Sequence, residues 1–299
     1  SSPHCSITPP RSNTSEASMS TAAWFHCGAG TAGDMTLASL IDAGADSLQV
    51  IEILGGLALD DYALMFERTQ RAGVGATRAI VGVHHHDDHH HHRAWRDIKQ
   101  LLVDSELPAR VRERALKVFG MLAEVEANIH GVAVNDIEFH EVGSVDAIVD
   151  IVGVCAALEV LKIDRIFCSN IAVGHGHINS AHGTLPNPAP AVTALAALRG
   201  ITLIGLDDHR ELATPTGVAL MAALADSFGA MPPLTVSSVG YGAGTNDIPG
   251  RANVVKVVIG ETLEKTVLSG AGQDIQLLEA NVDDVTGEVI AHTITELLN

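Results

Sequence analysis

The sequence has few aromatic residues, few basic residues and no long apolar run. Phe, Trp and Tyr make up 3% of the 299 residues, so Ala, Val, Leu and Ile must fill the core. Such a core is typical of helices packed over a sheet rather than of an aromatic-rich β-sandwich. Lys and Arg number 18 against 36 Asp and Glu, which gives a formal net charge of −18. This charge disfavours nucleic acid and anionic membranes as partners.

Cysteine is also scarce. Cys5, Cys27, Cys155 and Cys168 share no C-x-x-C spacing, which disfavours a zinc ribbon and a disulfide framework and fits a reducing cytoplasm. No stretch approaches 18 consecutive apolar residues, and residues 1–20 contain no apolar signal core. We therefore expect a cytoplasmic chain whose residues 1–20 are a disordered tail.

Strand-like and helix-like segments alternate along residues 21–265. Residues 21–42 predict a strand, a glycine-rich turn and a helix, and residues 93–131 predict an antiparallel helix pair from apolar spacings of three and four. The alternation predicts an α/β fold in which helices cover a mixed sheet. After a Gly- and Ser-rich linker, residues 272–299 predict one further strand, loop and helix, the truncated start of a C-terminal α+β domain.

Seven of the sixteen histidines lie within residues 84–92, a run broken only by Asp87 and Asp88. Neutral imidazole binds nickel, zinc, copper and iron near neutral pH. Consecutive side chains on a loop do not hold one geometry, so the run predicts a weak reservoir for several ions. A solvated polar loop without metal is the alternative, and the internal position disfavours a purification tag. The predicted metal-binding histidines are His84, His85, His86, His89, His90, His91 and His92.

The segment FHEVGSVDAIVD, residues 139–150, carries three carboxylates and an imidazole. Asp146 and Asp150 are four residues apart and share one face of the predicted helix. A helix cap at Ser144 and a favourable charge at the helix start explain Ser144 and Asp146 without a ligand. They do not explain Asp150, because an unpaired carboxylate among apolar neighbours is costly. Such a donor set suits several divalent ions, and the predicted metal ligands are His140, Glu141, Asp146 and Asp150.

Three further segments place glycine and hydroxyl groups at predicted helix starts or tight turns. CGAGTAGDM, residues 27–35, offers backbone N–H groups to a phosphate or carboxylate, or is a tight turn in which Asp34 caps the helix. ELATPTGVALM, residues 211–221, starts a helix for which capping alone explains Thr214. GYGAGTND, residues 240–247, allows a close backbone approach or is a bulged hairpin turn. The predicted ligand-binding residues are Gly30, Gly33, Thr214, Thr216, Gly217, Gly242 and Gly244.

Taken in order, several of these segments resemble the LarC-type nickel-insertion proteins over residues 24–299. The segments are AGTAGDMTLASLIDAG, the histidine run, FHEVGSVDAIVDIVG, AHGTLPNPAPA, ELATPTGVAL, GYGAGTND and LLEANVDDVTGE. The resemblance implies a nickel chelatase, a metal-inserting lyase that uses CTP to insert nickel into pyridinium-3,5-bisthiocarboxylic acid mononucleotide. The implied product is the nickel-pincer cofactor of lactate racemase or a related apo-enzyme. We also expect a homo-oligomer.

The resemblance gives the predicted residues roles. The histidine run becomes a nickel reservoir, and the segment from His140 to Asp150 becomes part of the metal path. The candidate catalytic residues are Asp34, Glu141 and Asp146. CTP with its Mg or Mn ion is implied in the C-terminal domain, which is represented here by its start; the candidate residues there are Asp284, Thr286 and Gly287.

The chain departs from the family pattern at its N-terminus, where His26, Gly28 and Ala29 replace an Asp and a Phe-Ser pair. Imidazole binds nickel but does not act as a carboxylate base, so no role is assigned to His26. Two other functions stay open: a nickel storage protein or metallochaperone without turnover, and an α/β binding module with an incidental histidine run.

Overall fold

The structure is a computed structural model that describes residues 19–59, 62–83, 93–139, 142–180 and 183–263, together with Thr286, Gly287 and Val289. The chain divides into two compact units, residues 1–264 and 265–299. Every helix and strand below belongs to the first unit. Several predictions fall outside the described residues: the tail up to residue 18, the histidine run, His140, Glu141, the linker and Asp284.

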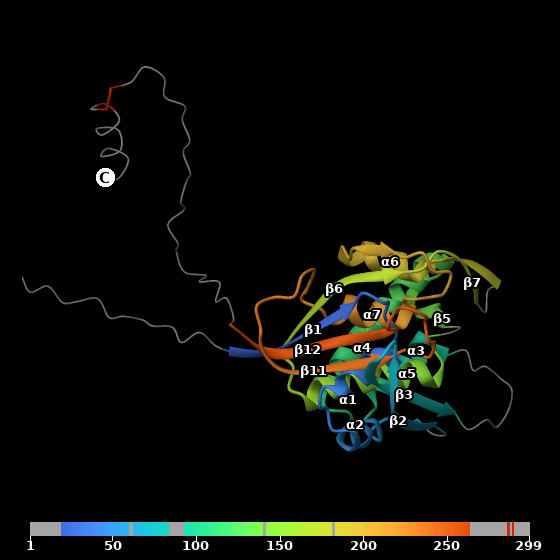
Figure 1. The fold of residues 1–299 in the computed structure, drawn as a ribbon. Coiled ribbons are helices and arrows are strands. Elements are labelled where there is room, and N and C mark those ends of the chain that lie inside the picture. Colours follow the sequence, from blue (N-terminus) through green and yellow to red (C-terminus); the bar gives the residue numbers. More distant parts are fainter. Residues whose placement is uncertain are drawn as a thin grey trace, which may run out of the picture. The chain divides into compact units, whose positions relative to one another are not determined.

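A large mixed sheet forms one layer of the first unit (Figure 1). Its strands follow the order β10-β6-β1-β12-β11-β3-β2, and β9 pairs with β6. Parallel pairs join β1 to β6 and β11 to β3, while β1 and β12 are antiparallel, so the predicted mixed α/β sheet is confirmed. The strands are β1 (Met19–Cys27), β2 (Tyr62–Arg71), β3 (Val74–Val83), β4 (Arg93–Ala94), β5 (Glu138–Phe139), β6 (Arg165–Val173), β7 (Gly176–Ser180), β8 (Gly183–Asn187), β9 (Leu203–Gly205), β10 (Ser227–Phe228), β11 (Thr235–Ala243) and β12 (Val254–Leu263).

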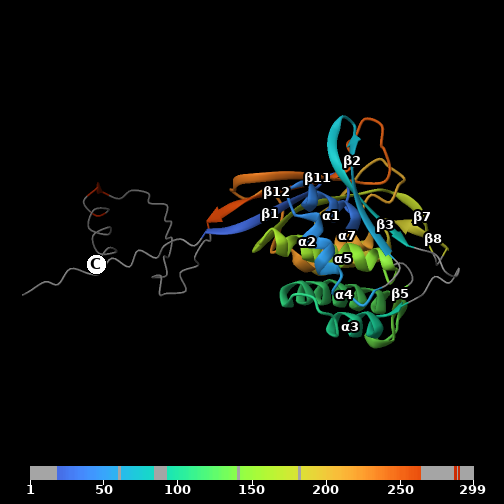
Figure 2. The same ribbon diagram turned by 90° about the horizontal axis from the view of Figure 1, so that it is seen from below.

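The helices cover one face of this sheet (Figure 2). Helix α1 packs on β11 and β3, α5 packs on α1 and α2, and α4 packs on α5 and α7 from the side away from the sheet. The outer helix α3 contacts α4. The helices are α1 (Gly33–Asp42), α2 (Ser47–Leu54), α3 (Trp95–Val103), α4 (Ala109–His130), the 3-10 turn η1 (Val134–Asp136), α5 (Val145–Val160), α6 (Pro190–Arg199) and α7 (Pro215–Leu224).

The core is built largely of Ala, Val, Leu and Ile, with Phe25 and Phe119 among its largest fully buried side chains. This agrees with the low aromatic content of the sequence. Helix α5 is apolar on nearly every side because helices flank it on both sides. No helix among the described residues combines the length and apolar character needed to cross a membrane.

One boundary differs from the sequence prediction. Met19 and Ser20, assigned to the tail, belong to β1 because they pair with Leu263 and Thr262 of β12. The long partner strand extends the sheet beyond the first apolar residues of β1, which the local sequence pattern does not reveal. The predicted helix over residues 33–42 is confirmed to the residue.

Candidate functional site

The N-terminal ends of three helices, α1, α5 and α7, meet at one cavity of about 370 Å³. We call it the aspartate cavity, after Asp34, Asp146 and Asp150 in its wall. Free backbone N–H groups give a helix N-terminus a partial positive charge, so three of them together favour negatively charged groups. The full lining is Ala32, Gly33, Asp34, Arg78, Ala79, Ile80, Val81, Val142, Ser144, Asp146, Ala147, Asp150, Glu211, Thr214, Pro215, Thr216 and Thr245.

Backbone pairing between two distant segments holds α1 and α7 in place. The N–H of Thr31 donates to the carbonyl of Leu212 at 2.9 Å, and the N–H of Thr214 donates to the carbonyl of Thr31 at 3.0 Å. Gly30 makes this pairing possible because it has φ +105°, and a Cβ there would lie 1.8 Å from the Leu212 oxygen. Gly30 thus serves a close contact between two backbones and does not line the cavity.

Gly33 and Gly217 permit equally close packing between the helices. A Cβ on Gly33 would lie 2.7 Å from the Cβ of Asp150 and 3.0 Å from Cγ2 of Thr216. A Cβ on Gly217 would lie 2.5 Å from the carbonyl oxygen of Thr31. These glycines therefore bring the starts of α1 and α7 and the first turns of α5 close enough to share one cavity. Of the two, Gly33 lines it and Gly217 does not.

Helix α7 begins as the sequence predicted. Thr214 is the N-cap, its Oγ1 accepts the N–H of Gly217 at 3.1 Å, and Pro215 occupies the first turn. Capping thus engages the hydroxyl of Thr214. Thr216 lines the cavity as well.

Helix α1 begins at the predicted residue, but its cap differs from the one that the sequence suggested. Its N-cap is Ala32 rather than Asp34, and no side chain caps it. Asp34 lies in the first turn, where its Oδ1 accepts the N–H of Met35 at 2.7 Å. The tight pairing at Thr31 sets the helix start two residues earlier than a capping Asp34 would, which leaves the Asp34 carboxyl at the cavity wall.

Burial and mutual repulsion raise the pKa of two of the three aspartates. The pKa of Asp150 lies well above its ordinary value, first because of burial and then because of the charges of Asp34 and Asp146. The pKa of Asp34 is also raised, mainly by burial, although Arg78 and the Met35 N–H oppose the rise. Among the described residues, the buried Oδ1 of Asp150 has no hydrogen-bond partner. An unpaired buried carboxyl oxygen is costly to the fold and is common at functional sites.

The predicted metal ligands are only partly brought together. Asp146 and Asp150 lie one turn apart on α5 and both line the cavity, whereas His140 and Glu141 are outside the described residues. Among the residues that are described, no three His, Cys, Asp or Glu side chains form a group that encloses a metal ion. The cavity therefore offers individual carboxylates rather than a closed metal cage.

Sequence reasoning missed Arg78 and Glu211 and did not select Thr245 among the ligand-binding residues. Arg78 projects from β3 into the cavity and is the basic side chain of its lining. The sequence contains a signal for Arg78, because this charged residue interrupts the small and apolar residues of β3. Thr245 is placed by Arg71, whose guanidinium donates to the carbonyls of Gly244 (2.7 Å) and Thr245 (3.2 Å).

Two predicted ligand-binding glycines do not line the aspartate cavity. A Cβ on Gly242 would lie 1.8 Å from the Met35 carbonyl oxygen, and one on Gly244 would lie 2.5 Å from the Asn253 side chain. These glycines do allow a close approach, as predicted, but the neighbours that approach them are α1 and Asn253 rather than a ligand. The exposed His26 is also outside the lining, and its ring lies 5.5 Å from the Trp24 ring.

Comparisons with known proteins agree with the sequence resemblance. The family described as "Nickel insertion protein" matches residues 23–299. Several relatives carry the name "Pyridinium-3,5-bisthiocarboxylic acid mononucleotide nickel insertion protein". The relative from Staphylococcus epidermidis is 39% identical over 94% of this chain and 68% of its own length. The relative from Geobacillus kaustophilus is 38% identical over 92% of this chain and 69% of its own length. No solved structure matches the chain.

Proposed function

Because this chain belongs to the nickel insertion protein family, we propose that it inserts nickel into pyridinium-3,5-bisthiocarboxylic acid mononucleotide. One observation carries the proposal: three helix N-termini and three aspartates converge on one cavity. The product is a nickel-pincer cofactor, and the recipient is lactate racemase or a related apo-enzyme. In this reaction nickel is a substrate, which the protein must bind and then release.

The carboxylates of the cavity are suited to hold nickel for a short time. Oxygen donors bind this ion less tightly than the sulfur donors of the thiocarboxylate groups. Transfer from Asp34, Asp146 and Asp150 to the substrate is therefore downhill. A protein that enclosed nickel in a complete set of ligands would have to break more bonds before transfer, so a few carboxylates on the wall favour release.

Several other groups of the lining favour the anionic parts of the substrate, and Glu211 adds a fourth carboxyl group to the wall. The N-termini of α1, α5 and α7, the guanidinium of Arg78 and the hydroxyls of Thr216 and Thr245 are groups that bind phosphate and thiocarboxylate. A divalent nickel ion offsets two of the three aspartate charges, and the charge of Arg78 acts on Asp34. The same cavity then accommodates both the cation and an anionic substrate.

We propose that turnover depends on CTP with Mg or Mn, which places the chain among metal-inserting lyases. In the unit of residues 265–299, the described residues Thr286, Gly287 and Val289 are exposed, and the Val289 N–H donates to the Thr286 carbonyl at 3.1 Å. This single turn does not define a nucleotide site, so CTP binding by Asp284, Thr286 and Gly287 rests on the family resemblance. A cytoplasmic location, a homo-oligomeric state and the lack of nucleic-acid or membrane partners complete the proposal.

The test is a transfer assay. The chain is incubated with nickel and the mononucleotide, with and without CTP and magnesium, and the product is identified by mass spectrometry and by activation of apo-lactate racemase. The full-length Staphylococcus epidermidis relative serves as the comparison. We expect the nickel-loaded product to form only when CTP is present.

Two outcomes would contradict the proposal. If the chain binds nickel but forms no product under any condition, the storage function suggested by the histidine run replaces it. If the chain forms product equally well without CTP, nickel insertion is supported and the proposed dependence on CTP is wrong.

A further inference from the structure

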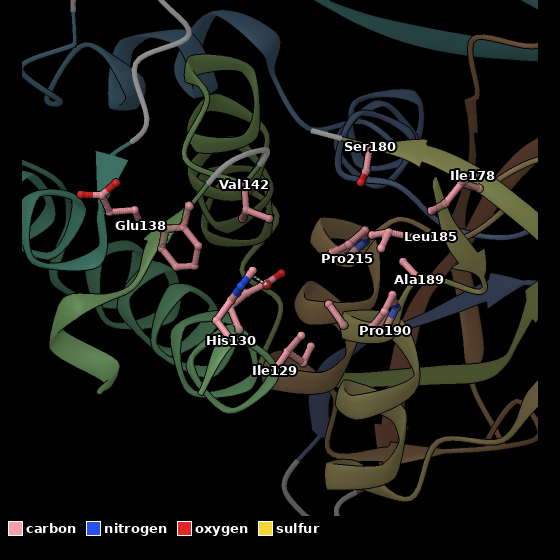
Figure 3. Close-up of a pocket in the computed structure, with 13 residues that line it drawn as sticks. Ile129, His130, Glu138, Val142, Ile178, Ser180, Leu185, Ala189, Pro190 and Pro215 are labelled. Atoms are coloured by element: carbon pink, nitrogen blue, oxygen red, sulfur yellow. Dashed lines mark ion pairs between the residues drawn. The ribbon is translucent and has the colours of Figure 1, made fainter. Parts of the chain in front are cut away.

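A second cavity, of about 240 Å³, lies directly beside the aspartate cavity. Val142 and Pro215 line both cavities, so the two share a wall. Figure 3 shows His130 and Val142 on one side of the second cavity, opposite Leu185 and Pro190 on the other. We call it the apolar cavity. Its elements are the end of α4, β5, the β7–β8 hairpin and the starts of α6 and α7.

The walls of the apolar cavity suit a flat ring. Apolar side chains dominate them, including Phe139, Ile178, Leu185 and Pro190. Aromatic and proline faces pack well against planar rings, and small-molecule sites are typically apolar with few polar groups.

The apolar cavity also holds a negative charge. Glu126 lines it and is 19% exposed, and its Oε2 lies 3.5 Å from Nε2 of His130. The dashed line in Figure 3 marks this contact, whereas the carboxylate of Glu138 points away from the cavity. A carboxylate in a mostly apolar wall attracts a cation more strongly than one in water, because the local dielectric constant is low. The cavity is thus complementary to a ring that is both flat and positively charged.

We propose that the apolar cavity binds the pyridinium ring of the substrate and directs its thiocarboxylate groups past Val142 and Pro215 into the aspartate cavity. This inference rests on the proposed function. Insertion joins nickel to the sulfur atoms and to a ring carbon, whose C–H bond breaks and gives its proton to a carboxylate of the aspartate cavity, so the ring must lie next to the place where the ion is held. The shared wall meets that requirement, and the charge of Glu126 matches that of the ring.

The test fills the apolar cavity without changing the aspartate cavity. Leu185→Trp and Ile178→Trp add bulk at two residues that face each other across the β7–β8 hairpin. Thr184→Trp is the matched control, because Thr184 is exposed, neighbours Leu185 and lies outside the lining of either cavity. Binding of the mononucleotide without nickel and binding of nickel without the mononucleotide are measured separately by calorimetry, with a thermal melt for each variant.

We expect both cavity-filling variants to bind the mononucleotide at least about 10-fold more weakly, while nickel affinity stays unchanged. Thr184→Trp should match the wild type in both measurements. Glu126→Gln adds no bulk and tests the charge. It should weaken binding of the pyridinium compound by roughly 3–10-fold and leave binding of benzene-1,3-bisthiocarboxylate, an uncharged ring, unchanged.

The outcomes separate this inference from the proposed function. If the wild-type chain does not bind the mononucleotide, both are wrong. If it does bind and the Leu185, Ile178 and Glu126 variants bind equally well, the ring lies elsewhere and only this inference is overturned. If the two tryptophan variants melt far below the wild type, Glu126→Gln decides the question alone.

Discussion

The aspartate cavity and the apolar cavity share a wall but are built in different ways. Backbone contacts at Gly30, Gly33 and Gly217 shape the aspartate cavity, where almost no added atom fits. Side chains from a helix end and a hairpin shape the apolar cavity. Backbone geometry holds a reacting ion to within fractions of an ångström, whereas side-chain walls tolerate variation in the ligand. The aspartate cavity should therefore determine the transfer reaction, and the apolar cavity should determine the affinity for the substrate.

The two cavities also differ in their cost to the fold. The aspartate cavity keeps a buried carboxyl oxygen of Asp150 without a partner and raises the pKa values of Asp34 and Asp150. The apolar cavity holds a glutamate, Glu126, that contacts His130. Residues that destabilise a protein at its functional site are typically those that the function requires.

Asp150→Asn should have the largest effect and should separate function from stability. The amide keeps the shape of the side chain but removes the charge, so nickel transfer should fall by about 100-fold or more. At a pH at which Asp150 is ionised, the unfolding free energy should rise by about 0.5–2 kcal/mol, because the amide removes a buried charge that Asp34 and Asp146 repel; the melting temperature should rise by roughly 2–4 °C per kcal/mol. Transfer assays and thermal melts check both. Asp97→Asn, at an exposed position, is the control, and a destabilised Asp150→Asn would refute the account.

Gly33→Ala should impair transfer by about 10–100-fold, because its Cβ collides with the Cβ and carboxylate of Asp150. Gly120→Ala is the matched control. It lies inside α4, where an added Cβ would meet its nearest neighbour at 3.9 Å, so it should leave activity intact and raise the unfolding free energy by about 0.5–1 kcal/mol. Equal activity in the two variants would show that Asp150 need not be held in place.

Nickel binding should release protons from Asp34 and Asp150 at pH values above 3.8. Because burial raises the pKa values of Asp34 and Asp150 above the ordinary 3.8, the folded chain holds these protons more tightly than the unfolded chain. The stability they contribute is complete below pH 3.8 and declines as pH rises through the raised values. Nickel displaces the protons, so its affinity should increase over the same interval. Calorimetry in buffers of different ionisation enthalpy measures the release, and identical release by Asp150→Asn would contradict the assignment.

Replacing the seven histidines of residues 84–92 with serine should have the smallest effect on the reaction. The run lies outside the described residues, and this prediction comes from its composition alone. The number of nickel ions bound per chain should fall, while the transfer rate at saturating nickel stays within about twofold of the wild type. Loss of transfer at saturating nickel would show that the histidines take part in the transfer itself and that the reservoir prediction is wrong.

Local features of the fold could be predicted from the sequence because local chemistry determines them. The bounds of α1, the cap at Thr214 and the shared face of Asp146 and Asp150 follow from periodicity, capping and helix geometry. Even Asp150 could be singled out, because its apolar neighbours predict burial.

The assembly of the cavity could not be predicted, because it depends on contacts between distant segments. The pairing of Thr31 with Leu212 joins residues about 180 positions apart, and no local pattern records it. The same reason explains Arg78, which reaches the cavity only through the position of β3 in the sheet. It also explains Gly242, whose close neighbour is α1 rather than a ligand.

The most direct test follows the nickel ion itself by X-ray absorption spectroscopy. The chain without its seven-histidine run is loaded with one equivalent of nickel, and spectra are taken before and after the mononucleotide is added with CTP and magnesium. We predict oxygen-rich coordination that depends on Asp150 at first, and sulfur coordination afterwards. An initial spectrum that Asp150→Asn leaves unchanged, or a final spectrum without sulfur, would contradict transfer from the aspartate cavity.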